Sequence, residues 1–401
     1  MKRGSLAAVL VVLAAVSSAR ADEEPDGNMR TWVDADYLLW WLKPAPAGPA
    51  LLSTGNLTSP TSLGSGILGT PGTSVLAGNS NFNQGPYSGF RIHAGMLNCA
   101  GTIGAEGSFF YLAQRGTSES FSSDNFGNPL LARPIIDARS GNETVLFVSA
   151  PGAFSGTFNA ESSTQFFGFD ANALFPWTRC AACYPDEIGH YVTGLAGFLY
   201  LNLRDDLTLS QSSNVLNNGI GFFDSFPIAP GGAIAVTDDI RTLNQFYGGQ
   251  IGVKAGLTWW RFTLNGTAKI AIGSMRENAT FSGSTTATVL GNSATVPGGL
   301  YALATNAGTQ SRNMVAVVPQ GLLNFSVEIT PQLKLTLGYT IFYLSNVARA
   351  GNVIDREINR TELPASQTFS PTVPGPQHPG VNWNGTDFWA QGINVGLNLH
   401  F

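Results

Sequence analysis

The sequence predicts an all-β protein, a closed antiparallel up-and-down transmembrane β-barrel of ten strands, with twelve as an alternative count. Three observations lead to this fold class. The final stretch, Asp387 to Phe401, alternates apolar and polar residues and ends on an aromatic residue. The same period-two alternation recurs along the chain, which is typical of strands with one apolar face. Long and short connections alternate strictly between these stretches, as in barrels with long loops at one end and short turns at the other.

The final stretch has two chemically distinct faces. In a barrel the apolar face meets lipid and the small or polar face meets the lumen. A strand of a soluble sandwich alternates in the same way, but it rarely ends the chain on an aromatic residue. The terminal Phe resembles the signal that barrel-assembly machinery reads, so this machinery is an expected partner. The apolar face carries Trp389, Ile393, Val395, Leu397, Leu399 and Phe401, and the other face carries Ala390, Gly392, Asn394, Gly396, Asn398 and His400.

Ten segments carry the alternation, and we expect the first and last to pair and close the barrel. An extra hairpin around Arg204-Asp205-Asp206 and Leu207 to Leu209 would raise the number to twelve. The predicted strands are Thr31 to Leu42, Phe90 to Met96, Ile103 to Tyr111, Thr164 to Phe175, Tyr191 to Leu203, Tyr247 to Leu257, Trp260 to Ile272, Val315 to Ile329, Leu333 to Tyr343 and Asp387 to Phe401.

Connection lengths orient the predicted barrel, because short turns face the periplasm and long loops face the exterior. With an even number of strands, both termini are expected in the periplasm. The short connections are Asn98 to Thr102, Pro176 to His190, the Leu257/Thr258 junction and Thr330 to Gln332. The long ones, rich in Gly, Ser, Thr, Asn and Pro, are Lys43 to Tyr87, Gly116 to Ser163, Arg204 to Arg241, Ser274 to Arg312 and Ser345 to Thr386.

The N-terminus predicts export. Lys2 and Arg3 precede an apolar run from Leu6 to Val16, and Ala19-Arg20-Ala21 forms a small-residue cleavage site. This order is typical of a signal peptide. We therefore expect residues 1–21 to be removed and residues 22–401 to form one barrel domain in a bacterial outer membrane.

Composition favours a membrane-facing surface and excludes nucleic acid as a partner. After Ala21 no stretch approaches the roughly 20 apolar residues of a membrane helix. Charged residues are only 12% of the chain, against about 25% in ordinary soluble domains. The 21 basic and 26 acidic residues form no basic run. Aromatic residues near strand ends predict a girdle at the lipid interface: Tyr37, Trp40, Trp41, Trp259, Trp260 and Trp389.

The polar faces of the strands predict charged residues in the lumen. They could tune the selectivity of a channel, or they could pair with one another and block it. Eight strands give an interior just filled by side chains, and open channels appear at about 16 strands, so ten strands favour a narrow or occluded lumen. The lumen candidates are Asp34, Asp36, Arg91, His93, Glu106, Asp170, Lys254, Arg261, Lys269, Glu328 and Lys334.

No enzyme, metal or cofactor site is predicted. The pairs Asp205/Asp206 and Asp238/Asp239 could activate water only beside a suitable base, and none of the four His is expected near them. Solvated carboxylates are the simpler interpretation. Cys180-Ala-Ala-Cys183 lacks the second pair of a zinc site, and we favour a disulfide from Cys99 to Cys180 or Cys183. The glycines of residues 64–69 have dinucleotide-loop spacing, but they neither follow a strand nor open a helix.

Three stretches resemble one of the numbered bacterial families described as putative beta-barrel porins: Trp32 to Trp41, Thr330 to Asn359, and Phe388 to Phe401. The middle stretch is the most specific, because Tyr343-Leu-Ser-Asn-Val, Arg349 and Ile354-Asp-Arg356 are not general barrel sequence. The sequence departs from the expected pattern at Leu199, where Arg was expected. The resemblance implies an outer-membrane barrel with a porin label and carries no substrate.

Two functions follow from these expectations. The first is a porin-like passive channel for small solutes. The alternative is a structural, adhesion or surface-interaction barrel with an occluded lumen, whose long loops bind a partner. Narrowness and mixed lumen charge favour the alternative, and the family resemblance favours the channel, which is the preferred prediction.

Overall fold

The computed structural model describes residues 30–55, 65–180, 188–216, 221–223 and 226–400. The predicted signal peptide, residues 1–21, and the terminal residue Phe401 lie outside these ranges. Among the described residues no helix is long and apolar enough to cross a membrane.

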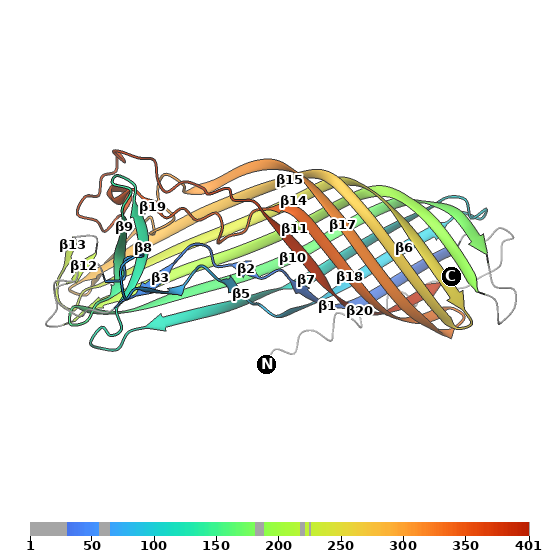
Figure 1. The fold of residues 1–401 in the computed structure, drawn as a ribbon, viewed down its shortest axis with the longest axis horizontal. Coiled ribbons are helices and arrows are strands. Elements are labelled where there is room, and N and C mark those ends of the chain that lie inside the picture. Colours follow the sequence, from blue (N-terminus) through green and yellow to red (C-terminus); the bar gives the residue numbers. More distant parts are fainter. Residues whose placement is uncertain (1–29, 56–64, 181–187, 217–220, 224–225, 401) are drawn as a thin grey trace.

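Ten long strands form one closed antiparallel sheet (Figure 1). Each pairs with its sequence neighbours, and β1 pairs with β20, with Trp32 opposite His400 and Leu42 opposite Ala390. This ring confirms the ten-strand barrel and the predicted pairing of the first and last strands. The strands are β1 (Arg30–Leu42), β6 (Pro86–Leu97), β7 (Gly104–Ser122), β10 (Phe154–Cys180), β11 (Gly189–Val215), β14 (Ala233–Trp259), β15 (Phe262–Val289), β17 (Gly308–Thr330), β18 (Leu333–Val347) and β20 (Thr386–His400).

The predicted twelve-strand alternative is not what the structure forms. The segment from Arg204 to Leu209 continues β11 without interruption and pairs with β14 from Leu243 to Asp238. Its residues alternate between buried and partly buried, so the charged triplet lies on two faces of one strand rather than in a hairpin turn.

The four central strands are far longer than a membrane requires. Strands β10, β11 and β14 have 27 residues each, and β15 has 28. At about 3.3 Å per residue and a tilt near 40°, such a strand rises about 70 Å, against an apolar band of about 25 Å. The barrel wall therefore continues well beyond the lipid, as the elongated outline in Figure 1 shows. Parts of three predicted long loops, in residues 116–163, 204–241 and 274–312, are strand because of this extension.

The outer surface changes from apolar to polar along each long strand. On β10, Phe169 and Phe175 are exposed near the short turns, whereas Thr157 and Glu161 are exposed toward the long loops. The exposed side chains of β15 change in the same direction, from Ile270 to Ser282. Apolar side chains facing outward in a continuous band are expected only where lipid covers them. The half of the barrel nearest the short turns is thus the membrane-spanning half.

The short turns differ in detail from the predicted ones. The turn at Pro331–Gln332 lies where it was expected, and β6 and β7 are joined by residues 98–103. Strand β10 runs on to Cys180 and β11 starts at Gly189, so the second turn is shorter than predicted. Strands β14 and β15 turn at Trp260 and Arg261 rather than at Leu257/Thr258. Trp260 has φ of 52° there, a left-handed conformation that a two-residue hairpin turn requires.

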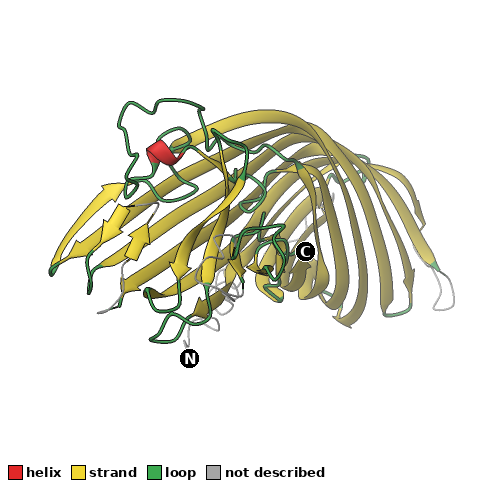
Figure 2. Ribbon diagram, turned by 60° about the vertical axis from the view of Figure 1, so that its left-hand side comes forward, coloured by secondary structure: helices red, strands yellow, loops and turns green. Residues whose placement is uncertain are grey.

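Most of the small elements, including β8, β9, β12, β13 and β19, lie at the long-loop end (Figures 1 and 2). Strands β8 and β9 form a hairpin whose partners are β3 and β19, and β16 extends a hairpin from β15. The described 3-10 helix, red in Figure 2, is Arg360–Glu362. The small strands are β2 (Ala45–Pro46), β3 (Leu52–Thr54), β4 (Ser74–Ala77), β5 (Asn81–Phe82), β8 (Leu131–Asp137), β9 (Glu143–Ser149), β12 (Gly221–Phe223), β13 (Phe226–Ile228), β16 (Asn292–Pro297) and β19 (Glu357–Ile358).

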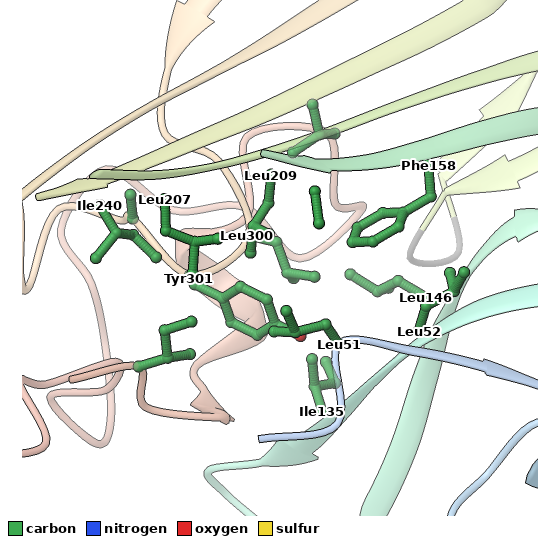
Figure 3. Close-up of a cluster of buried hydrophobic side chains, with 14 of the residues drawn as sticks. Leu51, Leu52, Ile135, Leu146, Phe158, Leu207, Leu209, Ile240, Leu300 and Tyr301 are labelled. Carbon is green, nitrogen blue, oxygen red and sulfur yellow. The ribbon is translucent and has the colours of Figure 1, made fainter. Parts of the chain in front are cut away.

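These connections pack against the inner wall of the barrel rather than extending into solvent. In Figure 3, Leu51, Ile135 and Tyr301 from the connections meet Phe158 and Leu209 from β10 and β11. All five are fully or almost fully buried. Because burial of apolar side chains stabilises by about 1.5–3 kcal/mol each, the inward fold of the connections is a true core. It fills the half of the barrel above the membrane.

The seam between β1 and β20 depends on glycines that allow close contact. A Cβ atom on Gly392 would lie 2.3 Å from the Leu39 carbonyl oxygen and 2.4 Å from the Trp40 Cα. We expect Gly392→Ala to destabilise the barrel by about 1–3 kcal/mol because the backbone must shift. Gly249→Ala is the matched control, since nothing lies within 4 Å of its added Cβ. Urea unfolding in detergent, followed by heat-modifiable gel mobility, gives the unfolding midpoints of both variants. Equal midpoints for Gly392→Ala and Gly249→Ala would contradict the packing argument.

Candidate functional site

The candidate site is the barrel lumen, where three layers of side chains follow one another along the axis. The register of neighbouring strands places charged residues opposite each other in the layer nearest the short turns. Asp34 of β1 lies opposite His93 of β6, and Asp36 lies opposite Arg91. Since residues two apart in a strand point to the same side, all four side chains enter the lumen.

Each of the four acidic residues in this layer has a basic partner. Asp36 binds Arg91, with Oδ2 2.7 Å from Nη2. Glu106 of β7 accepts from Lys254 of β14 at 2.5 Å. Every one of these carboxylates is mostly buried, where an unpaired charge would be costly. The two remaining pairs are Asp170 with Lys269 at 2.7 Å and Asp34 with His93 at 2.7 Å.

His93 joins two of these pairs. Its Nδ1 lies 2.7 Å from Asp34 Oδ2 and its Nε2 lies 3.2 Å from Glu106 Oε2. Amide groups complete the contacts, because Asn172 donates to Glu106 at 3.4 Å and to Asp170 at 2.9 Å. Gln250 then donates to the Asn172 oxygen at 2.6 Å. The result is a continuous polar network that crosses several strands of the wall.

Three other lumen candidates lie outside this network. Lys334 lines the cavity at the short-turn end. Arg261 is exposed in the β14–β15 turn, where its guanidinium donates to the backbone carbonyls of Glu328 and Ile329 at 3.0 Å each. Glu328 lies opposite Lys334 in the β17–β18 register and so faces the same side of the wall as that lysine, but it does not line the cavity. Arg261 thus differs from the prediction, because it lies in a turn where the alternation of the strand ends.

A layer of apolar side chains lies across the lumen above the charged network. Phe110, Phe166 and Phe342 form a cluster, with the Phe110 ring centroid 5.1 Å from that of Phe166 and 5.4 Å from that of Phe342. Phe388 continues the stack beside Phe166 at 5.3 Å. Trp40 also belongs here, with its indole N–H donating to Asn394 at 2.8 Å. Trp40 is fully buried, so its predicted place in the lipid-interface girdle is wrong, whereas Trp41 and Tyr37 are exposed on the outer wall.

A buried ion pair fixes a loop inside the barrel above the apolar layer. Arg349, in the connection after β18, binds Asp205 of β11. Both side chains are 1% exposed. Thr164 also donates to Asp205 at 2.7 Å. Next to it, Asn244 of β14 donates to the Ala348 carbonyl at 2.8 Å and accepts from the Ala348 N–H at 2.7 Å. The connection after β18 is therefore held by both charge and backbone hydrogen bonds.

A second buried ion pair lies in the upper core. Arg133 of β8 binds Asp238 of β14 at 3.0 Å, and neither side chain is exposed. The other oxygen of Asp238 accepts three backbone N–H groups, those of Leu300, Tyr301 and Ala302, at 2.7 to 3.0 Å. The Arg133 guanidinium lies over the Tyr301 ring, 4.7 Å from its centroid. One wall carboxylate thus fastens two separate connections.

These two acidic residues correct the prediction of solvated loop carboxylates. Asp205 and Asp238 point inward and are buried, whereas Asp206 and Asp239 point outward. Asp206 pairs with Arg204 at 2.8 Å and with Arg241 at 2.6 Å on the outer wall. Each Asp-Asp pair is thus divided between two faces of one strand. The alternation of period two, extended through residues 204–209, was the signal that could have found this.

The predicted disulfide stays a prediction. Cys99 is exposed in the β6–β7 turn, Cys183 lies outside the described residues, and the side chain of Cys180 is likewise not described. Within the described ranges, no cluster of three His, Cys, Asp or Glu side chains could hold a metal ion.

The fold and lumen define a class: a transmembrane antiparallel β-barrel whose interior is filled by side chains and inward-folded connections. The family comparison agrees with this class. The family described as "Putative beta barrel porin-7" matches residues 32–401, and the chain belongs to it. The matched range covers nine of the ten barrel strands in full, and it covers β1 except for Arg30 and Thr31. The protein is therefore an outer-membrane β-barrel of a porin family.

Solved structures give weaker likenesses, and no match was found among the curated proteins. The outer membrane protease OmpT of Escherichia coli is 11% identical, with 96% of this chain and 99% of that chain covered and a TM-score of 0.36. An anion-selective porin from Comamonas acidovorans is 9% identical, with 93% and 99% covered and a TM-score of 0.13. Both scores are too low to support any argument about this chain.

Removing one partner of the Arg349–Asp205 pair should lower the stability of the protein strongly, whereas replacing both partners with apolar residues should lower it little. We expect Arg349→Leu to destabilise the protein by about 3–5 kcal/mol, because it leaves the Asp205 carboxylate buried without its partner. The double variant Arg349→Leu/Asp205→Leu should recover most of that loss. Lys43→Gln, which removes the half-exposed pair with Asp387, should cost less than about 1 kcal/mol. Urea unfolding measures the stability of all three variants. A double variant as unstable as Arg349→Leu would show that the unpaired Asp205 carboxylate does not cause the loss.

A histidine in the long-loop end should make one connection sensitive to pH. His378 Nδ1 lies 2.8 Å from Asp355 and Nε2 lies 3.4 Å from Glu357. The hydrogen bond to Asp355, with added attraction from Glu357 and Glu362, raises the pKa of His378 above its usual value. The charged form therefore stabilises the connection below pH 6.5, and this contribution is lost as pH rises through the raised pKa.

Hydrogen exchange of residues 353–380 at several pH values measures this effect. Protection should fall as pH rises past neutrality, after correction for intrinsic exchange rates, and His378→Gln should remove the change. A pH profile identical in the wild type and the variant would show that His378 does not hold this connection.

Proposed function

We propose that this chain is a porin-family barrel with an occluded lumen, which acts as a structural or surface-interaction module of the outer membrane. One observation carries this proposal: connections from the long-loop end fill the barrel above the membrane and are fastened to its wall by Arg349–Asp205 and Arg133–Asp238. The apolar layer around Phe110, Phe166 and Phe342 adds a second barrier below. A solute would have to cross both.

The outer half of the barrel is suited to an interaction role. Its wall rises above the lipid band and presents Ser, Thr, Asn and charged side chains, such as Thr157 and Glu161. The connections folded into it give this region a core of its own, which holds the small strands β8, β9 and β19 at the outer end. A rigid, polar, protruding surface supports contact with a partner outside the cell, and its orientation follows the rule that long loops face the exterior.

A passive channel for small solutes is the second candidate, favoured by the porin family and by the cavity that enters the lumen from the short-turn end. It would require the connection after β18 to leave the barrel. The proposal also excludes catalysis by the acidic pairs. Asp205 and Asp238 are bound by arginines and buried, and Asp239 accepts from Thr208 at 2.7 Å on the outer wall.

Planar-bilayer recording of the purified, folded protein tests the occluded lumen. We expect no stepwise current in the wild type across a range of salt concentrations. Replacing residues 349–380 with a short Gly-Ser linker, together with Phe110→Ala, Phe166→Ala and Phe342→Ala in the apolar layer, removes both barriers and should raise the current above that of the wild type. Reproducible open-channel steps in the wild type would overturn the proposal in favour of the passive channel.

A further inference from the structure

The lumen below the apolar layer is a pocket that opens only at the short-turn end, and we call this pocket the cup. A cavity of about 490 Å³ extends from the short-turn end, where Gly101, Thr258 and His400 line it, to a floor that includes Trp40, Phe110 and Phe342. This volume lies within the range of sites for small molecules, about 300–1,000 Å³. By the predicted orientation the cup opens to the periplasm. Neither the interaction role nor the channel role explains a pocket whose inner end is the apolar layer.

The charges of the cup differ in sign from those of the whole chain. Six Lys and Arg line it against four Asp and Glu, whereas the chain as a whole has a net charge of −5. Each of the four acidic side chains already has a basic partner in the network described above. Lys334 of β18 and Arg30 of β1 form no ion pair with any carboxylate in the described part of the chain, and both lie near the mouth.

One wall of the cup offers hydroxyl and amide groups rather than ion pairs. It is built from β15, β17 and β18, and it includes Thr263, Thr267 and Asn324. Within the described ranges, the side-chain hydroxyls of Thr263 and Thr267 make no hydrogen bond to protein, so they are available to a ligand. Trp32 and Tyr191 add aromatic surface to the lining of the cup. Tyr191 is fixed by its own hydrogen bond to Asn265 at 2.8 Å.

We propose that this cup binds a small hydroxylated organic anion, a sugar acid or a sugar phosphate, from the periplasmic side. Lys334 and Arg30 attract and hold the carboxylate or phosphate near the mouth. The hydroxyls of Thr263 and Thr267 exchange hydrogen bonds with those of the ligand, and Trp32 packs against its carbon skeleton. Sugar acids and sugar phosphates share this chemistry, and the structure favours both over neutral sugars because basic side chains outnumber acidic ones in the lining of the cup.

The inference goes beyond the proposed function, and the two can fail separately. Binding in the cup depends on the lumen below the apolar layer, whereas conductance depends on the layer and on the connections above it. A protein that binds anions and also conducts would overturn only the occluded-lumen proposal. A closed protein that binds no anion would overturn only this inference.

Isothermal titration of the folded protein in neutral detergent micelles tests it, with gluconate, glucose 6-phosphate and glucose as probes. We expect at least one anion to bind ten or more times more tightly than glucose, and to bind more weakly as NaCl increases, because salt screens the partly exposed cations. The anion that binds more tightly shows whether the cup prefers a carboxylate or a phosphate.

Two Lys→Gln variants give a matched comparison. Lys334→Gln should weaken binding of the anion about tenfold or more, whereas Lys43→Gln, on the far side of the apolar layer beside Asp387, should leave its affinity unchanged. Heat-modifiable gel mobility verifies that both are folded. The proposal is overturned if neither anion gives heat of binding, if glucose binds equally well, or if folded Lys334→Gln binds as tightly as the wild type.

Discussion

Closure of the sheet at β1 and β20 is the constraint on which the rest of this structure depends. In the hydrocarbon region a strand edge has no water to satisfy its N–H and C=O groups, so only a closed ring is stable there. The antiparallel register from Trp32–His400 to Leu42–Ala390 provides that closure. Once ten strands are closed, the ring fixes how much space the inward side chains share.

The narrow ring explains why the lumen is layered. With about this number of strands, side chains from opposite walls reach one another, and buried charges must find partners because desolvation is costly. The membrane-spanning half meets this requirement with pairs such as Glu106–Lys254, and the apolar layer meets it by excluding polar groups. Above the membrane, Asp205 and Asp238 need partners that the wall does not supply, so Arg349 and Arg133 arrive from the connections. The same requirement thus pairs charges within the wall and anchors connections to it.

Porin membership and the occluded lumen that we propose are compatible in this chain because they concern different parts of it. The ring is the family's barrel, which matches from residue 32 to residue 401. Occlusion arises from side chains such as Phe110 and from the connection after β18. Both lie inside a wall whose outer face, with exposed residues such as Ile251 and Leu257, is that of an ordinary membrane barrel.

The sequence by itself determined the all-β class, the ten strands, the pairing of the first with the last, and the end of the barrel at which the long connections lie, because a period of two and the connection lengths are local properties. Nine of its eleven charged lumen candidates line the cavity, since alternation sets which side of a strand each residue faces. The sequence could not predict that Trp40 is buried in the lumen, that strands β10 to β15 extend beyond the membrane, or that Asp205 meets Arg349, 144 residues away. Those features depend on which side chains a closed wall brings together, and only the tertiary structure decides that.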